Sequence, residues 1–263
     1  MKKRALAIVL ATAVLLTFVL AAFTASAAPS SLADYEGSPS ITSPFTLETT
    51  APISGSASLA YALAGDGANV VNTGWTFAGL DAMGITVTDW SGNDYLGLKI
   101  KNTSTTDEVA INFYIGVGSE HVYLPTYAIT DVRVEEGDTV SPATASTYPM
   151  AGLPGDLPAI KLAAGFEGTV YLPLKADNGF YGGSTTAAAA PYNTITNLWF
   201  AFYAAANYSG SVLFDDIALY TAADVPAITY NPLLLTDYEN NSAASEVING
   251  AVPDDGTMSY EII

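Results

Sequence analysis

The chain of 263 residues contains no cysteine, one histidine and only 8 Lys and Arg residues. Without cysteine no disulfide can hold the fold, so burial of apolar side chains, helped or not by a metal, has to stabilise it. The scarcity of basic residues removes the positive surface that phosphate backbones need, so we expect no nucleic-acid partner.

The N-terminus is built differently from the rest of the chain. Three basic residues, 2–4 (KKR), precede an almost wholly apolar stretch, 5–22, and residues 25–27 (ASA) supply the small side chains of a cleavage site. This pattern predicts a secretory signal peptide over residues 1–28 and a secreted or cell-surface protein that is not in the membrane after cleavage. The alternative is an uncleaved anchor, because the apolar stretch nearly reaches membrane-spanning length.

The chain expected after cleavage is strongly acidic. Five basic residues then remain against 26 acidic ones, a formal charge of about −21. Such a surface suits divalent cations and neutral ligands such as sugars, and it also favours solubility.

Strand patterns dominate after residue 30, and no apolar stripe of helical period is sustained there. Short alternating segments, separated by Gly, Asn, Asp, Ser and Pro, predict a two-sheet antiparallel β-sandwich. The expected strands are 58–63, 95–102, 109–115, 168–174, 197–203 and 211–220. The residues expected in the core are Leu96, Leu98, Ile100, Ile111, Phe113, Leu172, Leu198, Phe200 and Phe202.

One internal repeat bears on domain organisation. Residues 32–36 (LADYE) recur 203 positions later at 235–239 (LTDYE), and 55–63 resembles 256–263. We therefore expect one module over 29–225, and over 226–263 a linker and the truncated start of a second similar module. If the repeat is real, the chain is a fragment of a longer protein, to which catalytic or anchoring modules can be appended. The alternative is that both segments are similar strands of one domain.

Four acids at the two ends of the module are the candidate metal ligands: Asp34, Glu36, Asp215 and Asp216. An acid buried alone in a strand costs several kcal/mol, so paired acids there need a cation or a place at the rim. If the first and last strands lie side by side, these carboxylates converge, which suits the oxygen ligands of calcium. The alternative is that they face solvent at the strand ends.

Aromatic residues are the candidate ligand contacts, because sugar rings stack their apolar faces on Trp and Tyr. Trp199, Tyr203, Tyr114 and Tyr171 lie on the phase opposite to the core residues of their strands. They predict a platform on the outer face of one sheet, unless a loop covers them as ordinary core. Phe180 and Tyr181 stand in a Gly-rich segment and are either ligand contacts or loop anchors.

Catalytic constellations are not recognisable in the sequence. The one histidine, His121, is expected in a loop at a strand edge, and no G-x-S-x-G motif is present. No spaced pair of carboxylates points to a glycosidase. We therefore expect a protein that is not an enzyme.

Four segments resemble motifs of one superfamily in the right order. They are 32–36 (LADYE), 89–102 (DWSGNDYLGLKIKN), 164–174 (AGFEGTVYLPL) and 212–217 (VLFDDI). Together they resemble the jelly-roll carbohydrate-binding modules of the galactose-binding-like superfamily, over about residues 31–221. The resemblance implies a jelly-roll sandwich and a structural Ca²⁺ held by Glu36 and Asp216.

The expected function is non-catalytic binding of a polysaccharide, a neutral plant or cell-wall glycan, by a multimodular bacterial protein. The alternative is a structural or adhesive surface module of the same fold without a glycan ligand, since a fold does not determine a function.

Overall fold

The computed structural model describes residues 28–229 except 38, 65–70, 77–78, 124–128, 130, 150–155 and 175–191. The chain divides into two compact units, Met1–Thr229 and Tyr230–Ile263. The expected signal peptide, apart from Ala28, and the expected start of a second module from residue 230 onward lie outside the described residues.

The described residues form short strands and one 3-10 helix, η1. Their bounds are β1 (Ser30–Ala33), β2 (Thr46–Glu48), β3 (Ser58–Ala64), β4 (Val71–Thr76), η1 (Leu80–Met83), β5 (Tyr95–Asn102), β6 (Val109–Val117), β7 (Glu120–Tyr123), β8 (Arg133–Glu136), β9 (Thr139–Pro142), β10 (Ala145–Pro149), β11 (Asp156–Leu162), β12 (Glu167–Pro173), β13 (Ile195–Ala204) and β14 (Ser209–Tyr220).

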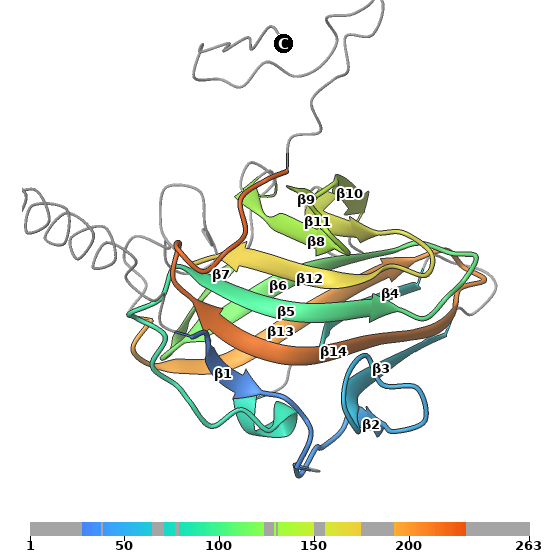
Figure 1. Cartoon of the computed structure of the whole chain (residues 1–263). Coiled ribbons are helices and arrows are strands. Elements are labelled where there is room, and N and C mark those ends of the chain that lie inside the picture. Colours follow the sequence, from blue (N-terminus) through green and yellow to red (C-terminus); the bar gives the residue numbers. More distant parts are fainter. Residues whose placement is uncertain are drawn as a thin grey trace, which may run out of the picture. The chain divides into compact units, whose positions relative to one another are not determined.

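The strands build two antiparallel sheets that pack face to face (Figure 1). The eight-stranded sheet has the order β2-β3-β14-β5-β12-β8-β9, with β1 also beside β14. The six-stranded sheet has the order β10-β11-β6-β13-β4, with β7 also beside β6. The predicted fold class, an all-β two-sheet sandwich, is confirmed.

The connectivity is that of a jelly roll. Strand β3 pairs with β14, β4 with β13, β5 with β12 and β6 with β11. These nested pairs belong alternately to the eight-stranded and the six-stranded sheet, which is the winding of a jelly roll. One consequence is that the last strand of the module lies at the centre of its sheet.

The core lies between the sheets and contains a series of aromatic contacts. The Phe214 ring on β14 lies 4.6 Å from that of Phe200 on β13, and Phe200 lies 5.5 Å from Phe113 on β6. On the neighbouring strand β3, Tyr61 stacks on Phe202 at 4.7 Å. All nine residues expected in the core have exposed fractions of 0 %. Alternation of apolar side chains therefore identified the inward faces correctly.

The six expected strands all exist, with bounds within a few residues of those expected. Strands β2, β4 and β7–β11 were not expected. Strands β2 and β7–β10 have only three to five residues, too few to show a period, and β4 and β11 contain Gly74 and Pro158, which interrupt a strand pattern. Residues 34–36, expected in the first strand, instead follow β1 in a turn, and Tyr35 has a positive φ of 59°. His121, expected in a loop, lies in β7.

A buried amide holds one end of the eight-stranded sheet. Asn102, at the end of β5, is 0 % exposed. Its Nδ2 donates to the carbonyls of Asp107 and Ala163, each at 2.9 Å, and its Oδ1 accepts from the Tyr208 hydroxyl at 2.9 Å. Because every polar atom of this side chain is satisfied, its burial fixes three loops at little net cost.

The outer face of the eight-stranded sheet carries a tyrosine cluster next to the end of the described chain. The Tyr171 and Tyr220 rings meet edge to face at 5.2 Å, and the Arg133 guanidinium lies 5.5 Å from the Tyr95 ring. Arg133 also donates to the Pro226 carbonyl at 2.8 Å. Residues 221–229 therefore pack against the module.

Two further bonds join these last residues to the edge strand β9. The Thr229 N–H donates to the Val140 carbonyl at 2.8 Å, and the Val140 N–H donates to the Thr229 hydroxyl at 3.4 Å. Contacts of the described module thus extend to Thr229, beyond the expected boundary at residue 225. Among the described residues, no helix has the length and apolar character that crossing a bilayer demands.

Removing residues 225–229 should destabilise the module. A chain ending at Asp224 should unfold with a free energy about 1–3 kcal/mol lower than one ending at Thr229, because it loses buried Val225 and the bonds to Arg133 and Val140. Urea unfolding of the two chains measures the difference. In the shorter chain Arg133→Met should cost less than in the longer one, and equal stability of the two chains would contradict this account.

Candidate functional site

Two groups of residues are candidate functional sites: an acidic junction and a stack of aromatic rings. The acidic junction consists of Glu36, Asp215 and Asp216 around the loop 53–56. It forms where β14 changes partner, from β3 at residues 209–214 to β1 at residues 217–219. The pairing of β14 with β5 is irregular between Asp215 and Ala218, which indicates a β-bulge, and Asp216 lies in the left-handed region with a φ of 42°.

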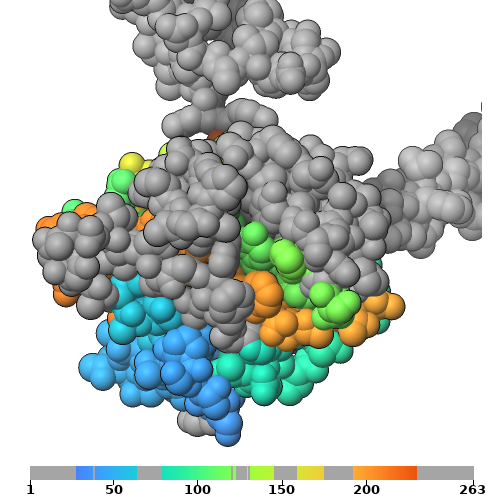
Figure 2. All heavy atoms as spheres, turned by 180° about the vertical axis from the view of Figure 1, so that it is seen from behind, coloured from blue at the N-terminus to red at the C-terminus, as the bar shows by residue number. Residues whose placement is uncertain are grey.

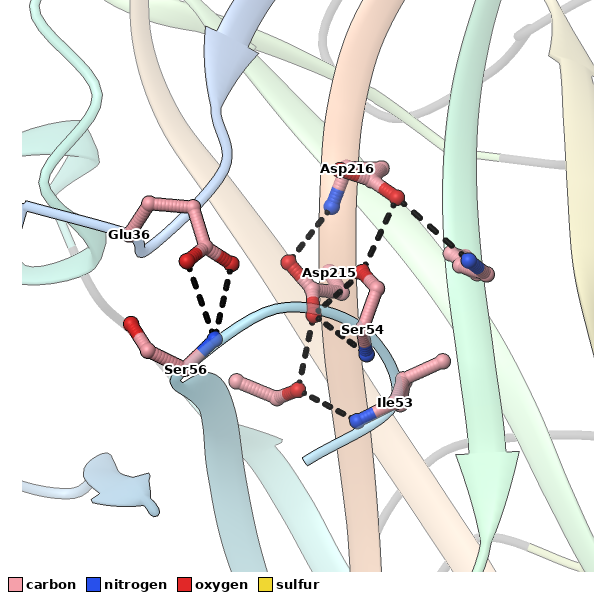
Figure 3. A network of polar contacts seen from close by, with 8 residues as sticks. Glu36, Ile53, Ser54, Ser56, Asp215 and Asp216 are labelled. Carbon is pink, nitrogen blue, oxygen red and sulfur yellow. Dashed lines mark hydrogen bonds and ion pairs between the residues drawn. The ribbon is translucent and has the colours of Figure 1, made fainter. Parts of the chain in front are cut away.

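The bulge explains why two neighbouring acids meet the same loop (Figure 3). Asp215 is 0 % exposed, and its Oδ2 accepts from the Ser58 hydroxyl at 2.8 Å and the Ser54 N–H at 3.3 Å. The Ser54 hydroxyl lies 3.1 Å from both Asp215 Oδ2 and Asp216 Oδ2, so it bridges the two carboxylates. Asp216 is exposed and pairs with Lys99 at 3.5 Å.

Glu36 reaches the same loop from the other side. Both of its carboxylate oxygens accept from the Ser56 N–H, at 3.1 and 2.9 Å. Gly55, with a φ of 55°, makes room for this carboxylate, since a Cβ there would lie within 1.5 Å of Glu36 Oε1. Asp34 accepts from the Glu36 N–H at 3.2 Å and so shapes the turn that carries Glu36.

Burial and charge perturb two groups at the junction. The pKa of Asp215 is raised, mainly because burial removes solvent and also because Asp216 is a neighbouring negative charge; its hydrogen bonds oppose the rise. The pKa of buried Tyr35 is raised by burial and by the charge of Asp215. The Tyr35 hydroxyl has no hydrogen-bond partner among the described residues.

The donor types at the junction fit a hard cation. Carboxylates of Glu36, Asp215 and Asp216 contact one loop, and the hydroxyl oxygens of Ser54 and Ser58 lie beside the two aspartates. Oxygen ligands of this kind, completed by carbonyls, are those that Ca²⁺ takes. In the part of the chain that the structure describes, no group of three or more His, Cys, Asp or Glu side chains is arranged to hold a metal by itself. A calcium site here would therefore depend on carbonyl and hydroxyl oxygens as well.

The second group, the ring stack, consists of Tyr114 on β6, His121 on β7 and Trp199 on β13. Their side chains lie on the outer face of the six-stranded sheet, and each is partly exposed. Tyr114 stacks on His121 at 5.4 Å and on Trp199 at 6.0 Å, with an angle of 21° between the rings in both pairs. Figure 2 shows this side, where the green and orange parts of the chain, which include β6, β7 and β13, reach the surface.

The strand pairing positions the stack. Trp199 lies opposite Tyr114 in the β13–β6 pair, and Tyr114 lies opposite Tyr123 in the hairpin that brings His121 to Gly116. The core neighbours Phe113, Ile115, Leu198 and Phe200 point the other way. Two rings of the expected platform, Tyr114 and Trp199, are therefore brought together.

The other expected platform residues do not join this stack. Tyr171 lies on β12 of the other sheet, is 5 % exposed, and donates its hydroxyl to Glu135 at 2.6 Å. Tyr203 shares the outer face of β13 but is 0 % exposed in a cluster with Ala110, Ala159 and Ala201. Both assignments to an open platform were wrong, because alternation indicates a face of a strand but neither its sheet nor its cover. Phe180 and Tyr181 lie outside the described residues.

Sequence reasoning missed His121 as a member of the stack. The segment 119–122 has no strand period, and nothing local connects a histidine at residue 121 with Trp199. The one usable signal in the sequence was Gly118, because a glycine readily adopts a positive φ in a hairpin turn. In the structure Gly118 has a φ of 63° in the turn between β6 and β7.

Comparison with known proteins gave no relationship: no protein-family model, no curated protein and no solved structure matches the chain.

The junction predicts a specific pH dependence in metal-free solution. Because the folded pKa of Asp215 exceeds its ordinary value of 3.8, the folded state holds the proton more tightly than the unfolded state. Between those two pKa values, the contribution of Asp215 to the free energy of unfolding should fall as pH rises, and it should stay low at neutral pH. Denaturant unfolding with chelator from pH 4 to 8, comparing the chain with Asp215→Asn, isolates this contribution.

The amide variant serves as the matched control, because it keeps an acceptor for Ser58 and carries no charge. The stability of the original chain relative to Asp215→Asn should decrease with pH. A difference that stays constant, or that grows with pH, would show that Asp215 is not destabilised as a charged group.

Proposed function

We propose that the chain is a non-catalytic carbohydrate-binding module of a secreted or cell-surface, multimodular bacterial protein. The ring stack of Tyr114, His121 and Trp199 carries this proposal, since it places partly exposed aromatic side chains on the outer face of a sheet, and sugar rings pack on such side chains. The resemblance to jelly-roll modules of the galactose-binding-like superfamily supports the same function.

Charge supports a neutral ligand. The whole chain has a formal charge of −18, and uronate polymers would meet repulsion. Neutral plant or cell-wall glycans, such as glucans or xylans, avoid it. Hydrogen bonds to sugar hydroxyl groups do not require a charge on the ligand.

A second function, a structural or adhesive module without a glycan ligand, is favoured by one observation. Tyr203 and the three alanines beside it are fully or almost fully buried although they lie on the outer face of the six-stranded sheet. A face that is partly covered offers less area to a polysaccharide. The two functions differ in what removal of Trp199 changes, binding or stability.

Calcium is the cofactor that the superfamily resemblance implies, and the acidic junction fits it. Glu36 and Asp216 would hold the ion, Asp215 would contribute from its buried position, and Asp34 would hold the turn of Glu36. Bound calcium would neutralise the carboxylates and fix β1, β14 and the loop 53–56 to one another. This role would be structural. Because the chain contains no cysteine, no disulfide can join these segments in place of the ion.

Loss of the stacked tryptophan tests the function. Trp199→Ala should weaken binding of a soluble glucan or xylan about fivefold, from a starting Kd of roughly 10 µM to 1 mM, because one stacked ring contributes on the order of 1 kcal/mol. Isothermal titration calorimetry measures the affinity, and His121→Ala should act in the same direction. Tyr220→Ala, an aromatic residue on the opposite sheet, is the control and should leave affinity unchanged.

If neither a glucan nor a xylan binds, and Trp199→Ala mainly lowers the melting temperature, the structural function replaces the proposed one.

Removal of metal tests the cofactor. Chelator should lower the melting temperature, and calcium at a hundredfold excess over its Kd should add about 2.7 kcal/mol to the free energy of unfolding. Glu36→Ala and Asp216→Ala should abolish the response, whereas Glu136→Ala, an exposed acid on β8, should keep it. A melting temperature that is the same in chelator and in calcium argues against a calcium site.

A further inference from the structure

A groove on the outer face of the eight-stranded sheet has no role in the proposed function. Its volume is about 490 Å³, within the range of small-ligand sites. The end of β2 contributes Glu48 and the loop after it Ala51, while β5 contributes Lys101, β12 contributes Glu167 and β14 contributes Leu213. The ring stack lies on the outer face of the other sheet, so the two surfaces are separate.

The pairing register of three strands determines which side chains form the bottom of the groove. Leu213 lies opposite Lys101, and Lys101 lies opposite Glu167, so the three side chains form one row across β14, β5 and β12. Leu213 belongs to the outward phase but is only 2 % exposed. The row thus gives an apolar floor at one end and a charged wall at the other.

The polar groups around this floor include both donors and acceptors. Lys101 Nζ lies 2.8 Å from Glu167 Oε2, and both side chains are partly exposed. Glu48 Oε1 accepts the N–H groups of Ala51 and Thr50, which lower the pKa of this carboxyl. The Thr103 hydroxyl oxygen accepts the Ser211 N–H at 2.7 Å, so its hydrogen is available to donate.

The charge of the groove selects the class of ligand. One lysine stands between two carboxylates, and the whole chain is strongly acidic, so an anionic ligand is disfavoured. Sugar hydroxyls both donate and accept, which matches carboxylates beside an ammonium and a threonine hydroxyl. Leu213, which is 2 % exposed, closes the bottom of the groove and adds little apolar surface, so the polar groups of the rim carry the recognition.

We propose that this groove binds a short neutral saccharide of one or two rings, as a site separate from the ring stack. The site does not depend on the proposed function, because it is made from other strands and the opposite face of the sandwich. If both sites bind, one module can hold two glycan chains on opposite sides.

The experiment maps binding on the full chain by NMR. Cellobiose and xylobiose are titrated to 50 mM into ¹⁵N-labelled protein, and weak binding with a Kd of about 0.1–10 mM is expected. Amide shifts at Ala51, Thr103, Gly165 and Ser211 report the groove, and shifts at Tyr114, His121 and Trp199 report the ring stack.

Two variants make the test specific. Lys101→Met should weaken the groove response about fivefold or more. Lys99→Met is the matched control, because Lys99 lies on the same strand with a similar side-chain exposure, 31 % against 30 %, and does not line the groove. Thr105→Trp, at an exposed position of the rim, should block the groove without disturbing the core.

The outcomes separate the two proposals. Shifts at the groove that Lys101→Met and Thr105→Trp reduce, and Lys99→Met does not, support the groove whether or not the ring stack responds. Shifts at the ring stack alone overturn the groove and support the proposed function. The absence of groove shifts with both saccharides, or a response that Lys101→Met leaves unchanged, also overturns it.

Discussion

The central position of β14 is the constraint on which the rest of the structure depends. This last strand of the module pairs with β3 and β5 on its two sides, and it also pairs with β1 beyond the bulge. Its inward residue Phe214 contacts Phe200 on the opposite sheet. Because β14 comes last in the module and lies at the centre of its sheet, its pairing with β1 brings the two ends of the module to one place.

The acidic junction is a direct result of that closure. Strand β14 cannot pair with β3 and β1 along one side without a break, and the bulge at Asp215 and Asp216 is that break. It turns a carboxylate into the interior, where only serine hydroxyls and backbone N–H groups offset its lost solvation. Glu36 meets the same loop because β1 ends beside it. The position therefore concentrates negative charge where the start and the end of the module meet.

The two outer faces differ in what they present. The face of the eight-stranded sheet carries the tyrosine cluster, the final residues up to Thr229 and a polar groove. The face of the six-stranded sheet carries three stacked rings beside a buried group of small residues. The first face combines ion pairs with a small apolar floor, and the second offers aromatic area. Under the two proposals, the first face would contribute hydrogen bonds to a glycan and the second would contribute stacking.

The sequence by itself determined the fold class, six of the seven described strands that have seven or more residues, and the inward residues, because apolar alternation reports burial on one face of a strand. It also identified the acids at the two ends of the module as a group. Tertiary structure alone decided that Tyr171 lies on the other sheet, that Tyr203 is covered, and that His121 joins Trp199. The physical reason is that alternation with a period of two shows which side chains share a face of a strand. Which other side chains that face contacts depends on strand order and register, and these are decided by residues far apart in the chain.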